Sequence, residues 1–104
     1  MKPHWNTRIG REVILVAAIH LAEQPGGWVR LTRAAIANKA KCSPGLVSAH
    51  LGSMESLKDK LVRVAIKQDN FDILIQALMA QNREACKMRP LLKQKALSHI
   101  QTGV

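Results

Sequence analysis

The stretch Leu31–Gly52, "LTRAAIANKAKCSPGLVSAHLG", decides the fold of this chain. It contains two helix starts, because Thr32 and Ser43 both belong to the residue types that accept hydrogen bonds from the first turn of a helix. The proline after Ser43 fits the first helical position, where no backbone N–H is needed. The stretch therefore predicts helices over 33–39 and 44–51, joined by "AKCS" and ended by a glycine.

Helical patterns also dominate on both sides of this stretch, and strand signals are nearly absent. Before it, we expect a helix from about residue 7 to 23, with Ile9, Val13, Ala17 and Leu21 on its core face. The following "QPGGW" ends that helix, since proline and glycine do not continue one cheaply. The predicted fold class is all-α.

After the stretch, Ser53 caps another helix, along which apolar residues recur at alternating spacings of four and three. This seam consists of Leu57, Leu61, Val64, Gln68, Phe71, Ile75 and Leu78. A break at 69–70 would divide it, so one long helix and two shorter ones both remain open. Pro90 stops the pattern, and a last short helix is expected over about 91–100.

The charge of the chain is strongly basic, with 16 Lys and Arg against 7 Asp and Glu, a formal charge of +9. Residues 1–67 hold eleven of the cations and four of the acids, whereas residues 68–104 hold five and three. Such a charge favours a polyanionic partner, nucleic acid before membrane, bound mainly by the first two-thirds. A merely soluble basic surface is the plainer alternative.

Several classes of protein are disfavoured by what the sequence lacks. Cys42 and Cys86 have no C-x-x-C spacing, and no histidine or cysteine pattern fits a metal, so we expect no metal, no cofactor and no enzymatic activity. The apolar run "VILVAAI" at 13–19 is too short to span a bilayer. The N-terminus has no signal-peptide layout, which favours a cytoplasmic protein without a membrane partner.

Two short helices joined by a turn of three or four residues follow the helix-turn-helix plan, whose second helix enters the DNA major groove. We therefore expect a DNA-binding domain over 1–67, with a basic N-terminal arm of Lys2, Arg8 and Arg11, and a dimerisation segment over 68–104. A solvated, partly disordered terminus is an equal alternative for the arm. Contacts with double-stranded DNA are expected at the starts of both helices, from Thr32, Arg33, Ser43, Pro44, Gly45, Leu46, Ser48 and Ala49. An ordinary helix corner, capped and solvated, is the alternative for the same residues.

Residues 11–67 resemble the DNA-binding domain of the TetR family of bacterial transcription regulators. The likeness rests on "ILVAAIHLA", "LTRAAIANKA" and "CSPGLVSAHLGSMESL". Residues that match the family pattern outright are Ala40, Ser43, Gly45, His50, Ser53, Glu55 and Leu57. The resemblance implies sequence-specific DNA binding, with His50 at the DNA-facing end of the recognition helix.

The chain departs from the family pattern at four positions. Lys41 stands where the turn glycine is usual, and Leu46 where threonine is usual. Ser48 replaces a tyrosine that contacts phosphate, and Met54 replaces a lysine. The candidates to supply the lost charge are Lys39, Lys41 and Lys58.

The resemblance covers little more than half of the chain, and only residues 68–104 follow it. So short a segment is hardly able to form a roomy ligand site, so we expect no small-molecule inducer. It suits a dimer interface, for which the predicted residues are Phe71, Ile75, Leu78, Leu92 and Leu97. Packing within the chain's own core is the default alternative for the seam, and we favour the dimer interface for the part beyond Gln68. Two copies spaced about 34 Å apart would read a palindromic site.

The leading hypothesis is a homodimeric transcription regulator, most simply a repressor. One alternative is a structural or assembly protein, such as a small phage DNA-packaging subunit, which would form rings. The other is a protein-binding adaptor whose helical seam docks another helix.

Overall fold

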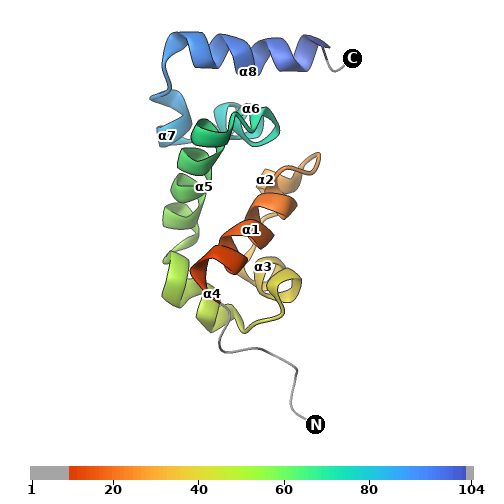
Figure 1. Cartoon of the computed structure of the whole chain (residues 1–104), viewed down its shortest axis with the longest axis vertical. Helices are drawn as coiled ribbons and strands as arrows, with labels where there is room; N and C mark the ends of the chain where they lie inside the picture. Colours follow the sequence, from red (N-terminus) through yellow and green to blue (C-terminus); the bar gives the residue numbers. More distant parts are fainter. Residues whose placement is uncertain (1–9, 103–104) are drawn as a thin grey trace.

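The computed structural model describes residues 10–102, with side chains for residues 10–98, and this part of the chain is all-helical, as predicted (Figure 1). The predicted contacts of Lys2, Arg8 and Ile9 lie outside the described residues. In chain order the helices are α1 Arg11–Ala22, α2 Gly27–Arg30, α3 Arg33–Ala40, α4 Pro44–Leu51, α5 Met54–Gln68, α6 Phe71–Met79, α7 Arg83–Cys86 and α8 Pro90–Thr102.

Helix α1 starts later than predicted, because Gly10 has extended backbone and is its N-cap. Its buried face also differs from the predicted one. The buried residues are Ile14, Ala17, Ala18 and Ala22, whereas Val13 is 50% exposed. The segment is apolar on all sides, so periodicity alone cannot select the buried face. The small alanine side chains allow close packing and form most of the face that is used.

A short helix, α2, forms where the sequence predicted only the end of the preceding helix. Gly26 adopts a left-handed backbone conformation with φ of 72°, and the chain turns into helix at Gly27. Trp28 is then buried, with 3% of its surface exposed. The burial of a large aromatic side chain offsets the cost of ordering this glycine-rich turn.

Helices α3 and α4 follow the sequence prediction closely. The Thr32 hydroxyl accepts a hydrogen bond from the Ala35 N–H at 3.1 Å, and the Ser43 hydroxyl accepts one from the Leu46 N–H at 3.2 Å. The turn between the helices comprises residues 41–43. Gly52 then turns the chain into α5 with φ of 76° and ψ of −148°, close to a region that essentially only glycine occupies.

The apolar seam is divided between two helices, which decides between the two alternatives left open by the sequence. Asp69 ends α5 in the left-handed conformation, and Asn70 caps α6 by accepting a hydrogen bond from the Ile73 N–H. Within α5 the seam residues Leu57 and Leu61 are fully buried, so this part belongs to the chain's own core.

The C-terminal part contains one more helix than predicted, α7, and its last helix is longer. Asn82 caps α7 by accepting hydrogen bonds from the Glu84 and Ala85 N–H groups. Pro90 is the first residue of α8, whereas the sequence predicted that the helix would begin just after it. A proline is tolerated at the first helical position. Helix α8 has 13 residues and was predicted to be short.

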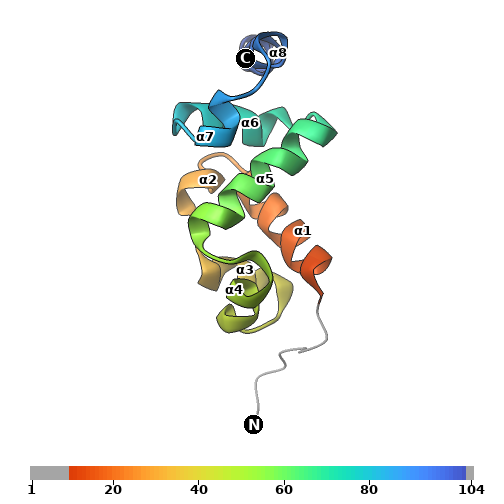
Figure 2. The same cartoon turned by 90° about the vertical axis from the view of Figure 1, so that its left-hand side faces the viewer.

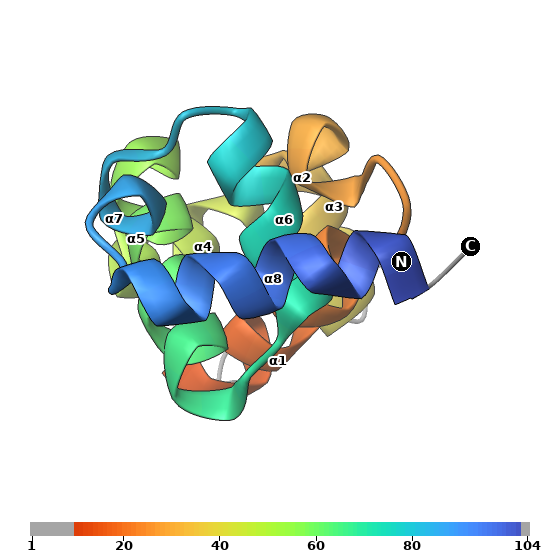
Figure 3. The same cartoon turned by 90° about the horizontal axis from the view of Figure 1, so that it is seen from above.

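One continuous core extends from Ile14 in α1 to Ala96 in α8, so it crosses the predicted boundary at residue 67. The α3–α4 pair lies at one end of the molecule and α8 at the opposite end (Figures 1 and 2). Viewed from the α8 end of the molecule, α8 lies across α6 (Figure 3). Helices α2, α5 and α6 lie between the two ends.

The side chain of Gln76 connects α6 to the turn between α1 and α2. Its oxygen accepts a hydrogen bond from the Trp28 N–H at 2.9 Å, and its amide nitrogen donates to the carbonyls of Ala22 at 2.7 Å and Gln24 at 3.1 Å. The Ala22 carbonyl at the end of α1 and the Trp28 N–H at the start of α2 would otherwise lack partners within their helices. The Gln24 carbonyl also accepts from the Gly27 N–H. Gln76 therefore connects α6, in the C-terminal half of the chain, to the ends of α1 and α2 in the N-terminal half.

Candidate nucleic-acid interface

Helix α4 has a buried side and an exposed side with very different residues. Val47 and Leu51 are fully buried and anchor the helix. Pro44, Gly45 and Ala49 are exposed. A methyl group added at Gly45 would meet only the Ser43 hydroxyl, 4.0 Å away. The N-terminal half of α4 thus presents small side chains to open space, and another molecule could approach its backbone closely.

The chain contains no aspartate or glutamate between Glu23 and Glu55, and we call residues 24–54 the acid-free segment. This segment includes α3 and α4 entirely. Its cations are Arg30, Arg33, Lys39 and Lys41, all exposed. None of the four forms an ion pair with another residue that the structure describes. The four cations around α3 and α4 are therefore not neutralised by a direct ion pair with a described carboxylate.

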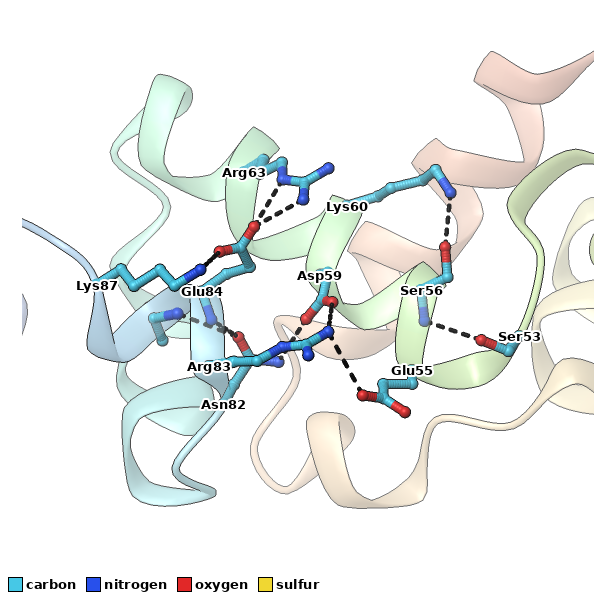
Figure 4. Close-up of polar contacts among 11 residues, drawn as sticks. Ser53, Glu55, Ser56, Asp59, Lys60, Arg63, Asn82, Arg83, Glu84 and Lys87 are labelled. Atoms are coloured by element: carbon cyan, nitrogen blue, oxygen red, sulfur yellow. Dashed lines mark hydrogen bonds and ion pairs between the residues drawn. The ribbon is translucent and has the colours of Figure 1, made fainter.

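The carboxylates of α5 and α7 are paired with each other's cations (Figure 4). Asp59, 8% exposed, accepts hydrogen bonds from the side chains of Asn82 at 3.2 Å and Arg83 at 3.1 Å. Glu84 accepts from Arg63 at 2.7 Å. The hydrogen bond from Arg63 lowers the pKa of Glu84, and the hydrogen bond to Asp59 raises the pKa of Arg83. This cluster holds α7 against α5, and Arg63 and Arg83 are engaged there.

The predicted DNA-contacting residues differ in exposure: some are exposed, some are partly buried, and two make contacts within the chain. Arg33, Lys41, Pro44, Gly45 and Ala49 are exposed at or near α3 and α4, as is Thr32, whose oxygen serves as a cap. Ser43, Ser48 and His50 are partly buried.

Leu46 and Lys58 are engaged elsewhere. Leu46 packs against the core, because the first turn of α4 directs it inward. Lys58 places its ammonium 5.3 Å from the centre of the Trp28 ring, a cation–π contact within the chain. The structure therefore gathers most of the predicted set but not these two.

Lys41 illustrates a departure from the family pattern that has a structural cost. It ends α3 in the left-handed conformation, with φ of 59° and ψ of 49°, where glycine is favoured. An L-residue loses about 1 kcal/mol there.

We expect Lys41→Gly to raise the free energy of unfolding by about 1 kcal/mol, because the strain of the side chain is removed. Urea denaturation measures this. Lys41→Ala is the matched control, since it removes the same charge but keeps the Cβ atom, and it should give no such gain. Equal stabilities of the glycine and alanine variants would contradict the assignment of strain to Lys41.

The predicted dimer residues are mostly occupied within the chain. Phe71, Ile75, Leu78 and Leu92 are partly buried and pack against the core. Leu97 alone of the five is substantially exposed, at 51%. The seam beyond Gln68 thus holds α6 on the rest of the molecule, and Leu92 does the same for α8.

Three further features of the described part of the chain concern its buried thiol, metal-binding groups and membrane-spanning helices. Cys42 is buried, and this burial raises the pKa of its thiol, which disfavours the nucleophilic thiolate. Within that part, no group of three or more His, Cys, Asp or Glu could hold a metal ion. None of its helices is both long and apolar enough to cross a bilayer.

A groove of about 460 Å³ lies between the end of α5 and the start of α8, lined by Ile66, Asp69, Lys87, Met88, Arg89, Leu91, Leu92 and Lys95. Its volume is within the range of small-molecule pockets. A surface groove of this size does not test the expectation that no small-molecule inducer binds, which stays a prediction.

Comparison of the chain with protein-family models, with curated proteins and with solved structures finds no match. The resemblance to the TetR family thus stays a prediction from the residues quoted above. The acid-free segment is not part of any motif quoted above, although it can be read from the sequence as a gap between Glu23 and Glu55.

Proposed function

We propose that this protein is a sequence-specific regulator of transcription that binds double-stranded DNA as a homodimer, with α4 as the recognition helix. Two copies would read a palindromic site, and occupation of that site would most simply repress transcription. The first residues of α4 would face base edges in the major groove. The exposed cations of α3 and of the turn would bind phosphates.

One observation carries this proposal: an anchored helix with small exposed side chains lies within the acid-free segment. Val47 and Leu51 hold α4 rigidly, so its exposed side keeps a defined position. Gly45 and Ala49 offer little steric hindrance to a base edge, and an alanine can also contact a thymine methyl group. A basic patch without this anchored helix would support only non-specific binding.

Phosphate contacts would surround the recognition helix. Arg33 is the first residue of α3 and is exposed beside the N-terminal N–H groups of that helix. Lys39 and Lys41 lie at the other end of α3, next to the turn into α4. Cations on both ends of α3 would fix the orientation of α4 without reading sequence themselves.

The test is selection of bound duplexes from a random pool, followed by titration against salt. We expect a palindromic consensus, and an affinity that falls about 10³-fold or more between 50 and 200 mM salt if the dimer neutralises six to eight phosphates. A poly-acidic peptide serves as a control for binding by charge alone. Failure to bind any duplex at low salt would reject the proposal and favour a protein-binding adaptor. Rings formed on DNA without a consensus would favour an assembly protein.

A further inference from the structure

A groove of about 330 Å³ between α2 and α6 stands out because its lining is mostly apolar and contains no charged residue. It is lined by Gly26, Val29, Gln76, Met79 and Ala80. Val29 is 80% exposed and Met79 is 76% exposed, which are the highest values among the exposed large hydrophobic residues described. Large apolar side chains that are mostly exposed and share one groove are typical of an interaction surface.

We propose that this α2–α6 groove is the surface through which two copies of the chain meet. The inference rests on the proposed function in one respect, because it assumes that the protein is a homodimer. It assigns the contact to Val29 and Met79, residues outside the set predicted from the apolar seam. Most of that set is already packed against the chain's own core.

Charge favours this groove over the exposed apolar residues of α8. In a two-fold contact the same patch faces itself, so every charge lies near a second charge of equal sign. Helix α8 offers Leu91 and Leu97, but the chain has no acidic residue after Glu84. The cations there are Lys87, Arg89, Lys93 and Lys95. No charged residue lines the α2–α6 groove. The exposed Arg30 lies beside Gly26 at its edge, so a second copy meets fewer like charges here than at α8.

Position in the fold favours the same groove. The axis of a two-fold contact lies within the plane of contact. A contact at the α8 end would therefore join two molecules end to end, with their α4 helices pointing in opposite directions (Figure 1). Helices α2 and α6 lie between the two ends, so a contact on this flank allows the axis to run along the molecule (Figures 1 and 2). Both α4 helices can then face one duplex.

Burial of the groove would leave little polar surface unpaired. Gln76 is its polar lining residue, and its side chain already accepts from the Trp28 N–H and donates to the carbonyls of Ala22 and Gln24. Covering it with a second copy thus removes few hydrogen bonds to water. The flexible side chain of Met79 can adapt to the opposing surface.

The test compares Met79→Lys and Val29→Lys with the matched control Leu97→Lys, by sedimentation equilibrium without DNA. All three residues are at least half exposed, so each variant should fold, and circular dichroism verifies this. We expect the wild type and Leu97→Lys to dimerise equally. Each groove variant should raise the dimer dissociation constant about tenfold or more, because two lysines then face each other across the axis.

Either of two results with the variants would overturn the assignment: groove variants that dimerise like the wild type, or a Leu97→Lys variant that is the weaker dimer. A wild type that stays monomeric at every concentration would also overturn it. The proposed DNA binding is judged separately, by the duplex selection above. A monomeric variant that still binds a single half-site would leave that proposal standing, whereas a dimer that binds no duplex would reject DNA binding alone.

Discussion

Replacing Ser48 by glutamate is expected to reduce affinity for the selected duplex about 100-fold or more while leaving the fold intact. Ser48 lies on α4 and is partly buried beside the exposed Ala49. A carboxylate here would face the DNA phosphates at close range, and like charges brought together at an interface cost several kcal/mol. The side chain of a glutamate is long enough to keep its charge in solvent in the free protein, so folding should be little affected.

The controls for this variant separate charge from position. Gln94→Glu makes the same charge change on exposed α8, at the opposite end of the molecule, and should weaken binding only slightly. Ala49→Glu places the charge at a fully exposed neighbour and should reproduce the loss even if Ser48→Glu were to disturb packing. A fluorescence-anisotropy titration gives the affinities. Duplex binding that is unchanged in both α4 variants would show that α4 is not the recognition helix.

Gly27→Ala should lower the free energy of unfolding by about 3 kcal/mol or more, among the largest effects of a single added methyl group. A Cβ atom at this position would lie 1.9 Å from the carbonyl oxygen of Leu21 and 3.0 Å from that of Ala22. Both are backbone atoms, so α1 and α2 would have to separate, and the burial of Trp28 would be lost with them. For a domain of this size, such a loss lowers the melting temperature by about 15 °C.

Two other glycines, Gly26 and Gly45, provide the comparison for Gly27. At Gly26 there is space for a side chain, but φ is 72°, so Gly26→Ala should cost only about 1 kcal/mol. Gly45 faces open space within α4, so Gly45→Ala should be neutral or slightly stabilising. Thermal unfolding followed by circular dichroism ranks the three. If Gly27→Ala lost no more stability than Gly26→Ala, α2 could not approach the end of α1 as closely as described.

The parts of this fold that could be predicted are those with local causes. Thr32, Ser43 and Ser53 each accept a hydrogen bond from a backbone N–H three residues further on, so the start of each helix is encoded within a few positions. The predicted bounds of α4 were therefore correct. The buried face of α1 and the existence of α2 could not be predicted in this way. Both depend on side chains brought from elsewhere, such as Gln76, which binds the backbone of Trp28 across 48 positions of sequence.

The sequence by itself determined that the chain is helical, where α3 and α4 begin and end, and that the segment around them has no acidic residues. Only the tertiary structure decided which side chains remain available to a partner. Arg33 and Lys41 are exposed and unpaired among the described residues, whereas Lys58 covers Trp28 and Arg83 binds Asp59. The apolar seam was taken into the core, and Val29 and Met79 were left exposed in one groove. The physical reason is that capping acts over three residues, while ion pairing and burial depend on contacts between helices far apart in sequence.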